Sequence, residues 1–157
     1  MKRMLSALFA VGLVAVLAAA VTAWAKPNGN HGHKGHKTIT VIEHATTDTT
    51  TDTGATGDSA GDLLTFANEV FDRTDSNAVG MSQGYCVRVK PGEFYECNWT
   101  NLLPGGNIVV EGPFYDAKDS VLAITGGTGR YRKARGTMKL ESREGGAKFA
   151  FIFHIDR

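Results

Sequence analysis

Short stretches in which apolar and polar residues alternate follow one another along the second half of the chain. The clearest covers residues 147–155, where Phe149, Phe151 and Phe153 recur at every second position. A period of two is typical of a β-strand that buries one face. Clusters of Gly, Pro and Asp separate the stretches and favour turns. The expected strands cover residues 38–44, 63–71, 79–89, 94–102, 108–115, 120–125, 136–143 and 147–155.

About eight short strands, with no long helical period after the N-terminal segment, predict an all-β sandwich or barrel. A closed barrel leaves no strand edge unpaired, and eight strands enclose enough space for one small ligand. We therefore predict an eight-stranded antiparallel β-barrel with a central apolar cavity over residues 38–157. The outer face of the last expected strand is itself partly apolar, which indicates packing between subunits or cover by a loop.

Residues 1–25 have the composition of a signal peptide. Lys2 and Arg3 precede an uncharged apolar run from Leu5 to Ala23, and the sequence AWA at 23–25 fits a signal-peptidase site. A retained membrane helix needs about 20 apolar residues, so the length also fits an anchor. The small residues at the end of the run and the polar residues after it favour cleavage. We expect a secreted protein without a stable membrane anchor.

Two segments are too polar to join a core. Residues 26–37 are rich in Gly, His and Lys, and residues 46–61 are rich in Thr, Asp and Gly. Neither buries enough apolar surface to offset the loss of chain entropy, so we predict a disordered linker and a mobile loop. His31, His33 and His36 could bind a transition metal. A solvated tail is the interpretation we favour, and we expect no metal site.

Charge and motifs exclude several classes of function. The chain has 17 basic and 16 acidic residues and a formal net charge of +1, which gives no electrostatic attraction for nucleic acid. The glycine-rich run at 126–136 lacks the spacing of a phosphate-binding loop. No Ser-His-Asp or Cys-His arrangement stands out, because His44 and His154 stand alone on expected strands. We expect no cofactor.

Cys86 and Cys97 lie on either side of the turn signal Pro91-Gly92. In an exported chain, an even pair of cysteines predicts a disulfide bond. If Lys90 and Glu93 close the turn, antiparallel pairing places the two cysteines directly opposite each other, within bonding distance. A bulge in the hairpin would shift this register.

Four segments, in consistent order within residues 61–155, resemble one known family. They resemble the allene oxide cyclases, and the second and fourth resemble the plant dirigent proteins equally well. The resemblance implies an eight-stranded barrel with an apolar cavity, commonly assembled as a homotrimer. The four segments are GDLLTFANEVF (61–71), VGMSQGYCV (79–87), GPFYDAKDSVLAITGGTG (112–129) and YRKARG (131–136).

The resemblance implies control of a reactive small molecule. Allene oxide cyclases isomerise an unstable fatty-acid epoxide into a cyclopentenone. Dirigent proteins hold phenoxy radicals, made by a separate oxidase, so that they couple stereoselectively. Both orient a ligand in a dry cavity. The implied function is to bind a small apolar or phenolic ligand and steer its cyclisation, as an isomerase, or its coupling. A non-catalytic carrier and a structural module with a filled barrel are the alternatives, and the sequence does not decide whether the protein is an enzyme.

The resemblance also places individual residues. Glu43 takes the position of the cyclase glutamate, Asn68 that of a pocket asparagine and Cys86 that of a pocket cysteine. A buried Glu43 would have a raised pKa and could act as an acid; a solvent-facing strand glutamate is the alternative. We assign Glu43 as the polarising catalytic carboxylate and Asn68 as its polar partner. The expected ligand-pocket residues are Phe66, Cys86, Trp99 and Phe114.

Three positions depart from the cyclase pattern. Phe114 replaces the pocket tyrosine, and the adjacent Tyr115 faces the opposite side of the strand. Ala45 stands in place of an asparagine, and the segment Leu64-Thr65-Phe66 lacks the pocket proline. A disulfide at Cys86 would also remove its thiol. These departures keep the cavity but argue against the reaction of the plant cyclases.

Overall fold

The computed structural model describes residues 36–156. The expected signal peptide and all of the expected linker except its last two residues lie outside this range. Within it, no helix is long and apolar enough to cross a membrane. The described elements are β1 (Lys37–His44), β2 (Thr49–Thr51), β3 (Leu63–Phe71), β4 (Ala78–Lys90), β5 (Phe94–Leu103), β6 (Gly106–Tyr115), β7 (Ser120–Gly127), η1 (Gly129–Tyr131), β8 (Gly136–Arg143), η2 (Glu144–Gly146) and β9 (Lys148–Ile155).

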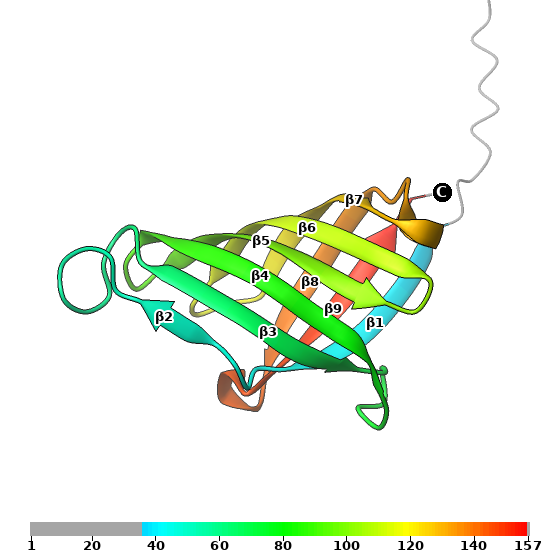
Figure 1. The fold of residues 1–157 in the computed structure, drawn as a ribbon, viewed down its shortest axis with the longest axis horizontal. Coiled ribbons are helices and arrows are strands. Elements are labelled where there is room, and N and C mark those ends of the chain that lie inside the picture. Colours follow the sequence, from blue (N-terminus) through cyan, green and yellow to red (C-terminus); the bar gives the residue numbers. More distant parts are fainter. Residues whose placement is uncertain (1–35, 157) are drawn as a thin grey trace, which may run out of the picture. The chain divides into compact units, whose positions relative to one another are not determined.

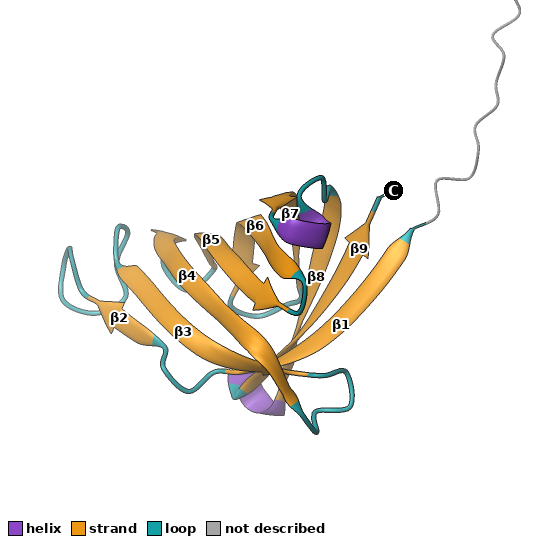
Figure 2. Cartoon of the chain, turned by 45° about the vertical axis from the view of Figure 1, so that its right-hand side comes forward, coloured by secondary structure: helices purple, strands orange, loops and turns teal. Residues whose placement is uncertain are grey.

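The strands form one antiparallel sheet that closes on itself (Figures 1 and 2). Each strand from β3 to β8 pairs with the next in sequence, β9 pairs with β1, and β1 pairs with β3. The predicted eight-stranded antiparallel barrel is thereby confirmed, with β1 and β3–β9 as its strands. The short β2 adds to the free part of the β3 edge.

The seam between β1 and β3 is the shortest in the barrel. Only Ile42 and Glu43 of β1 pair with β3, opposite Phe71 and Val70, whereas all of β1 pairs with β9. The strand β2 then pairs with the first residues of β3. Both β1 and β2 therefore lie along one edge of β3, with a gap between them.

The side chain of Asn68 fills this gap. Its Oδ1 accepts hydrogen bonds from the backbone N–H groups of Thr46 and Thr47, at 3.1 and 2.9 Å, and its Nδ2 donates to Asp48 at 2.7 Å. An amide side chain thus satisfies backbone donors that lack a strand partner. The segment 46–61, expected as a mobile loop, begins with this anchor and contains β2; its mobility stays a prediction.

Successive side chains point to opposite faces of each strand, and the large apolar ones point into the barrel. Phe149, Phe151, Phe153 and Ile155 of β9 are buried, as the pattern predicts. The largest side chains with almost no exposure are Phe151, Phe153, Ile108, Leu122 and Met138.

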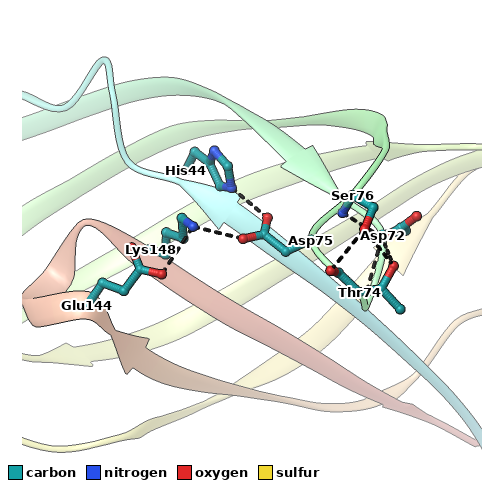
Figure 3. A network of polar contacts seen from close by, with 7 residues as sticks. All are labelled: His44, Asp72, Thr74, Asp75, Ser76, Glu144 and Lys148. Atoms are coloured by element: carbon teal, nitrogen blue, oxygen red, sulfur yellow. Dashed lines mark hydrogen bonds and ion pairs between the residues drawn. The ribbon is translucent and has the colours of Figure 1, made fainter.

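The β3–β4 loop, residues 72–77, contacts the outer face of β1 and β9 at His44 and Lys148. Ile42 and Ala150 point outward by alternation and are nevertheless buried. Asp75 of the loop accepts a hydrogen bond from His44 (2.6 Å) and one from Lys148 (2.8 Å), as Figure 3 shows. The loop thus contacts the outer face at the His44–Lys148 end of these two strands, and both explanations for the apolar outer face stay predictions.

A disulfide bond joins Cys86 of β4 to Cys97 of β5, as predicted. The two cysteines are directly opposite each other in the hairpin. The register shifts between Arg88 and Lys90, so that Lys90 pairs with Phe94. This bulge lies between the cysteines and the turn, and the cysteine register is unaffected.

Candidate functional site

A small chamber lies inside the barrel and has a volume of about 30 Å³. This is room for one or two water molecules. Its walls come from seven strands and from the segment that follows β1, and most of them are apolar. The lining residues are Glu43, Asp48, Leu64, Phe66, Cys86, Trp99, Phe114, Leu140, Phe149 and Phe151.

The structure brings five of the six predicted site residues to this chamber: Glu43, Phe66, Cys86, Trp99 and Phe114. Asn68 does not line it but reaches it through its hydrogen bond to Asp48. The functional roles of these residues stay predictions. The thiol of Cys86 is absent because its sulfur is in the disulfide.

Glu43 provides a carboxyl group in an apolar surrounding. Its side chain faces the interior and is 4% exposed, so the solvent-facing alternative does not hold. The Ser82 hydroxyl donates a hydrogen bond to Oε1. Burial raises the pKa of Glu43 to about 7; hydrogen bonds from Ser82 and Asn68 oppose this rise, and the Asp48 carboxylate adds to it. Near neutral pH the group exists in both protonation states.

Aromatic rings form the walls beside Glu43. Trp99 lies edge-on to Phe66, with ring centroids 5.9 Å apart, and also contacts Phe151 at 5.6 Å. Phe114 and Phe149 form a second edge-on pair at 5.6 Å. The buried Nε1–H of Trp99 has no hydrogen-bond partner among residues 36–156. Such a donor is costly to leave unpaired.

Sequence reasoning missed three polar residues near Glu43. Ser82 and Asn101 are fully buried and lie opposite each other on β4 and β5, and Asp48 lies in the low-complexity segment. A signal for Ser82 existed, because it shares the strand face of Cys86 at a spacing of four. The position of Asp48 depends on Asn68, which the local sequence does not reveal.

The histidines in the described range lie away from the chamber. His44 is on the outer face, stacked on Phe71, and His154 is exposed. Across residues 36–156 no three His, Cys, Asp or Glu side chains are grouped to hold a metal ion.

These features define a small closed β-barrel that carries an ionisable group inside an aromatic-walled chamber. The chain belongs to the allene oxide cyclase family, whose sequence profile matches residues 40–156.

Solved structures with diverse functions share the fold. A pyocyanin demethylase is 24% identical, with a TM-score of 0.64, over 74% of this chain and 100% of that protein. A pterocarpan synthase dirigent protein is 15% identical, with a TM-score of 0.61, over 77% of this chain and 83% of that protein. A Diels-Alderase from Streptomyces koyangensis is 11% identical, with a TM-score of 0.60, over 81% of this chain and 71% of that protein. At these identities the likeness establishes a common barrel fold.

Proposed function

We propose that the protein binds a small apolar or aromatic ligand in its barrel and steers the cyclisation of that ligand, with Glu43 as the acid. One observation carries the proposal: a carboxyl group with a pKa of about 7 is buried among aromatic side chains. A general acid works best when its pKa lies near the working pH. Burial of a carboxyl group without a countercharge is costly, which favours a functional reason for it.

The arrangement suits an isomerisation, in which the ligand keeps all its atoms. Protonated Glu43 would donate a hydrogen bond or a proton to an oxygen of the ligand as negative charge develops there, and would recover the proton when the ring closes. The aromatic walls would hold the ligand in a reactive shape and exclude water. The Trp99 N–H, which lacks a partner within the described range, would suit an acceptor atom of the ligand.

The related barrels support ligand steering as a class. The neighbours with this fold include a dirigent protein and a Diels-Alderase, whose names describe directed bond formation. Stereoselective coupling of the dirigent type would require radicals made by a separate oxidant, whereas cyclisation requires no co-reactant. For this reason we place cyclisation first.

A non-catalytic carrier is the second candidate. Phe114 has no hydroxyl group, Ala45 has no amide, and the sulfur of Cys86 is in a disulfide. Three polar groups of the plant cyclase pocket pattern are thereby missing. The same chamber would then hold a ligand without converting it.

We further propose that the protein is exported and assembles as a homo-oligomer. The disulfide fits an oxidising compartment. The outer face of β4 exposes an apolar stripe, defined as Met81, Tyr85, Val87 and Val89, which are 37–50% exposed. Large apolar side chains exposed on one strand face, here with the polar Gln83 between Met81 and Tyr85, favour contact between protein chains.

The test starts with native mass spectrometry of the protein from its own host, followed by extraction of any bound small molecule. We expect one apolar or aromatic ligand per chain, and uptake of the neutral aromatic probe N-phenyl-1-naphthylamine by the emptied protein. The substitution Glu43→Gln should leave probe affinity within about threefold. It should slow conversion of the ligand's precursor by about 100-fold or more, the usual contribution of a general acid.

The matched control is Glu69→Gln, because Glu69 lies on the exposed face of β3. It should behave as the wild type. Release of every bound ligand unchanged by the wild type would favour the carrier. An empty protein that takes up no probe would contradict both candidates and leave the structural role.

A further inference from the structure

The chamber beside Glu43 is too small for the ligand proposed above. Its volume of about 30 Å³ holds one or two water-sized groups. Sites for organic ligands usually span about 300–1,000 Å³. Only the end of such a ligand fits beside Glu43, and the rest needs another compartment.

An outer hollow of about 480 Å³ adjoins the chamber at the barrel mouth. It lies between the β6–β7 loop, residues 116–119, and the β8–β9 turn, residues 144–147. The chamber and the hollow share three lining residues, Phe114, Leu140 and Phe149. The edge-on rings of Phe114 and Phe149 therefore form a common wall between them.

The charge of the outer hollow is confined to its rim. The shared residues give it an apolar floor, and Asp116, Lys118 and Asp119 from the β6–β7 loop line it as well. Lys118 Nζ lies 4.1 Å from the ring centroid of Tyr115. A ligand body that is apolar near Glu43 and polar at its far end matches this lining.

A second hollow at the same mouth of the barrel has no wall in common with the chamber. It measures about 430 Å³ and lies under the β2–β3 loop, and it shares no lining residue with the chamber. The buried Arg88 lines the second hollow. It forms ion pairs with Asp58 (2.7 Å) and Asp116 (2.8 Å) and stacks on Tyr95. Opening this side would break the ion pairs of Arg88 with Asp58 and Asp116.

We propose that the ligand binds across the Phe114–Phe149 wall, with its reacting end beside Glu43 and its body in the outer hollow. This inference rests on the proposed function and specifies its substrate class. The substrate is an elongated or flat apolar molecule with a compact reactive end, and it tolerates a polar group at the other end. Rotation of one or both phenylalanine side chains joins the two compartments.

Two matched substitutions test this route. Ser142 lines the outer hollow and Thr50 lines the second hollow, and both are exposed strand residues. The substitutions Ser142→Trp and Thr50→Trp place the same large ring in one hollow or the other. The readout is the dissociation constant of N-phenyl-1-naphthylamine by fluorescence, for variants whose thermal unfolding matches that of the wild type.

We expect Ser142→Trp to weaken probe binding at least tenfold and Thr50→Trp to change it less than twofold. If Ser142→Trp does not fold, Ser142→Phe provides the same test with a smaller ring. Equal binding by the two variants, or a larger loss in Thr50→Trp, would overturn the route and leave the proposed function standing. No probe binding by the wild type would overturn both.

Discussion

Glu43 and Ser82 lie far apart in the sequence, yet their side chains meet inside the barrel. Ser82 provides a hydrogen bond, but the apolar walls provide no countercharge. Burial therefore prevails over hydrogen bonding, and the pKa rises to about 7. The same group that suits acid catalysis must then affect folding stability as the pH changes.

We predict that Glu43 makes stability fall as the pH rises from about 4.5 to about 7. The folded protein keeps the Glu43 proton up to about pH 7, whereas the unfolded chain releases it near the ordinary value of 4.5. The stabilisation is complete below pH 4.5 and is lost as the pH passes the folded pKa, in total about 3 kcal/mol. Urea unfolding at pH 4.5 and 7.5 measures it.

Glu43→Gln is the reference for this measurement, because its amide does not titrate and the other carboxylates remain. We expect the wild type to lose stability relative to the variant between the two pH values. Parallel stability curves for the two proteins would contradict the raised pKa.

At the residue scale, the alternation of apolar and polar residues predicted part of the chamber lining. It predicted that Phe149 and Phe151 face inward, and the family resemblance added Phe66 and Glu43. Asp48 could not be foreseen, because its place depends on the amide of Asn68 between two strand segments. The bonds of Asn68 to Thr46 and Thr47 favour a positioning role for this residue.

At the scale of elements, local patterns were sufficient for the eight barrel strands. The bounds of β3 and β8 match the expected ranges, and the others differ by a few residues at most. The strand β2 was missed because Thr49–Thr51 belongs to a polar repeat with no buried face. It forms only because β3 has a free edge beyond β1, which is a property of the closed barrel.

The β4–β5 hairpin joins a cross-strand disulfide to the chamber wall. We predict that loss of this bond, in the double substitution Cys86→Ala and Cys97→Ala, lowers the free energy of unfolding by about 3 kcal/mol, because the unfolded chain gains freedom. The measurement is urea unfolding with and without a reductant. The reductant should destabilise the wild type and leave the variant unchanged. Equal sensitivity of both proteins would contradict a structural disulfide.

At the scale of the whole molecule, the barrel covers one apolar outer region and exposes another. Ile42 and Ala150 are buried on the outer face of β1 and β9, and Asp75 of the nearby β3–β4 loop forms an ion pair with Lys148. The β4 stripe has no such cover within the described residues.

We predict that the β4 stripe mediates self-association. The double substitution Tyr85→Lys and Val89→Lys should reduce the mass in sedimentation equilibrium from an oligomer to a single chain, because it places charge in an apolar contact. The control is Val121→Lys, since Val121 is 55% exposed on β7. A monomeric wild type would contradict the prediction, as would an equal effect of the control.

The pairing of the first barrel strand with the last has a consequence for how the chain folds. Lys37 lies opposite Ile155, so this contact spans almost the whole domain, whereas the other barrel pairs, apart from the short β1–β3 seam, join neighbouring strands. Local hairpins form quickly, and contacts between distant residues form slowly. The strands β3–β9 can thus assemble progressively as a meander, whereas β1 can pair along its whole length only after β9 has formed. A chain cut before Lys148 would leave β1 held by two residue pairs alone.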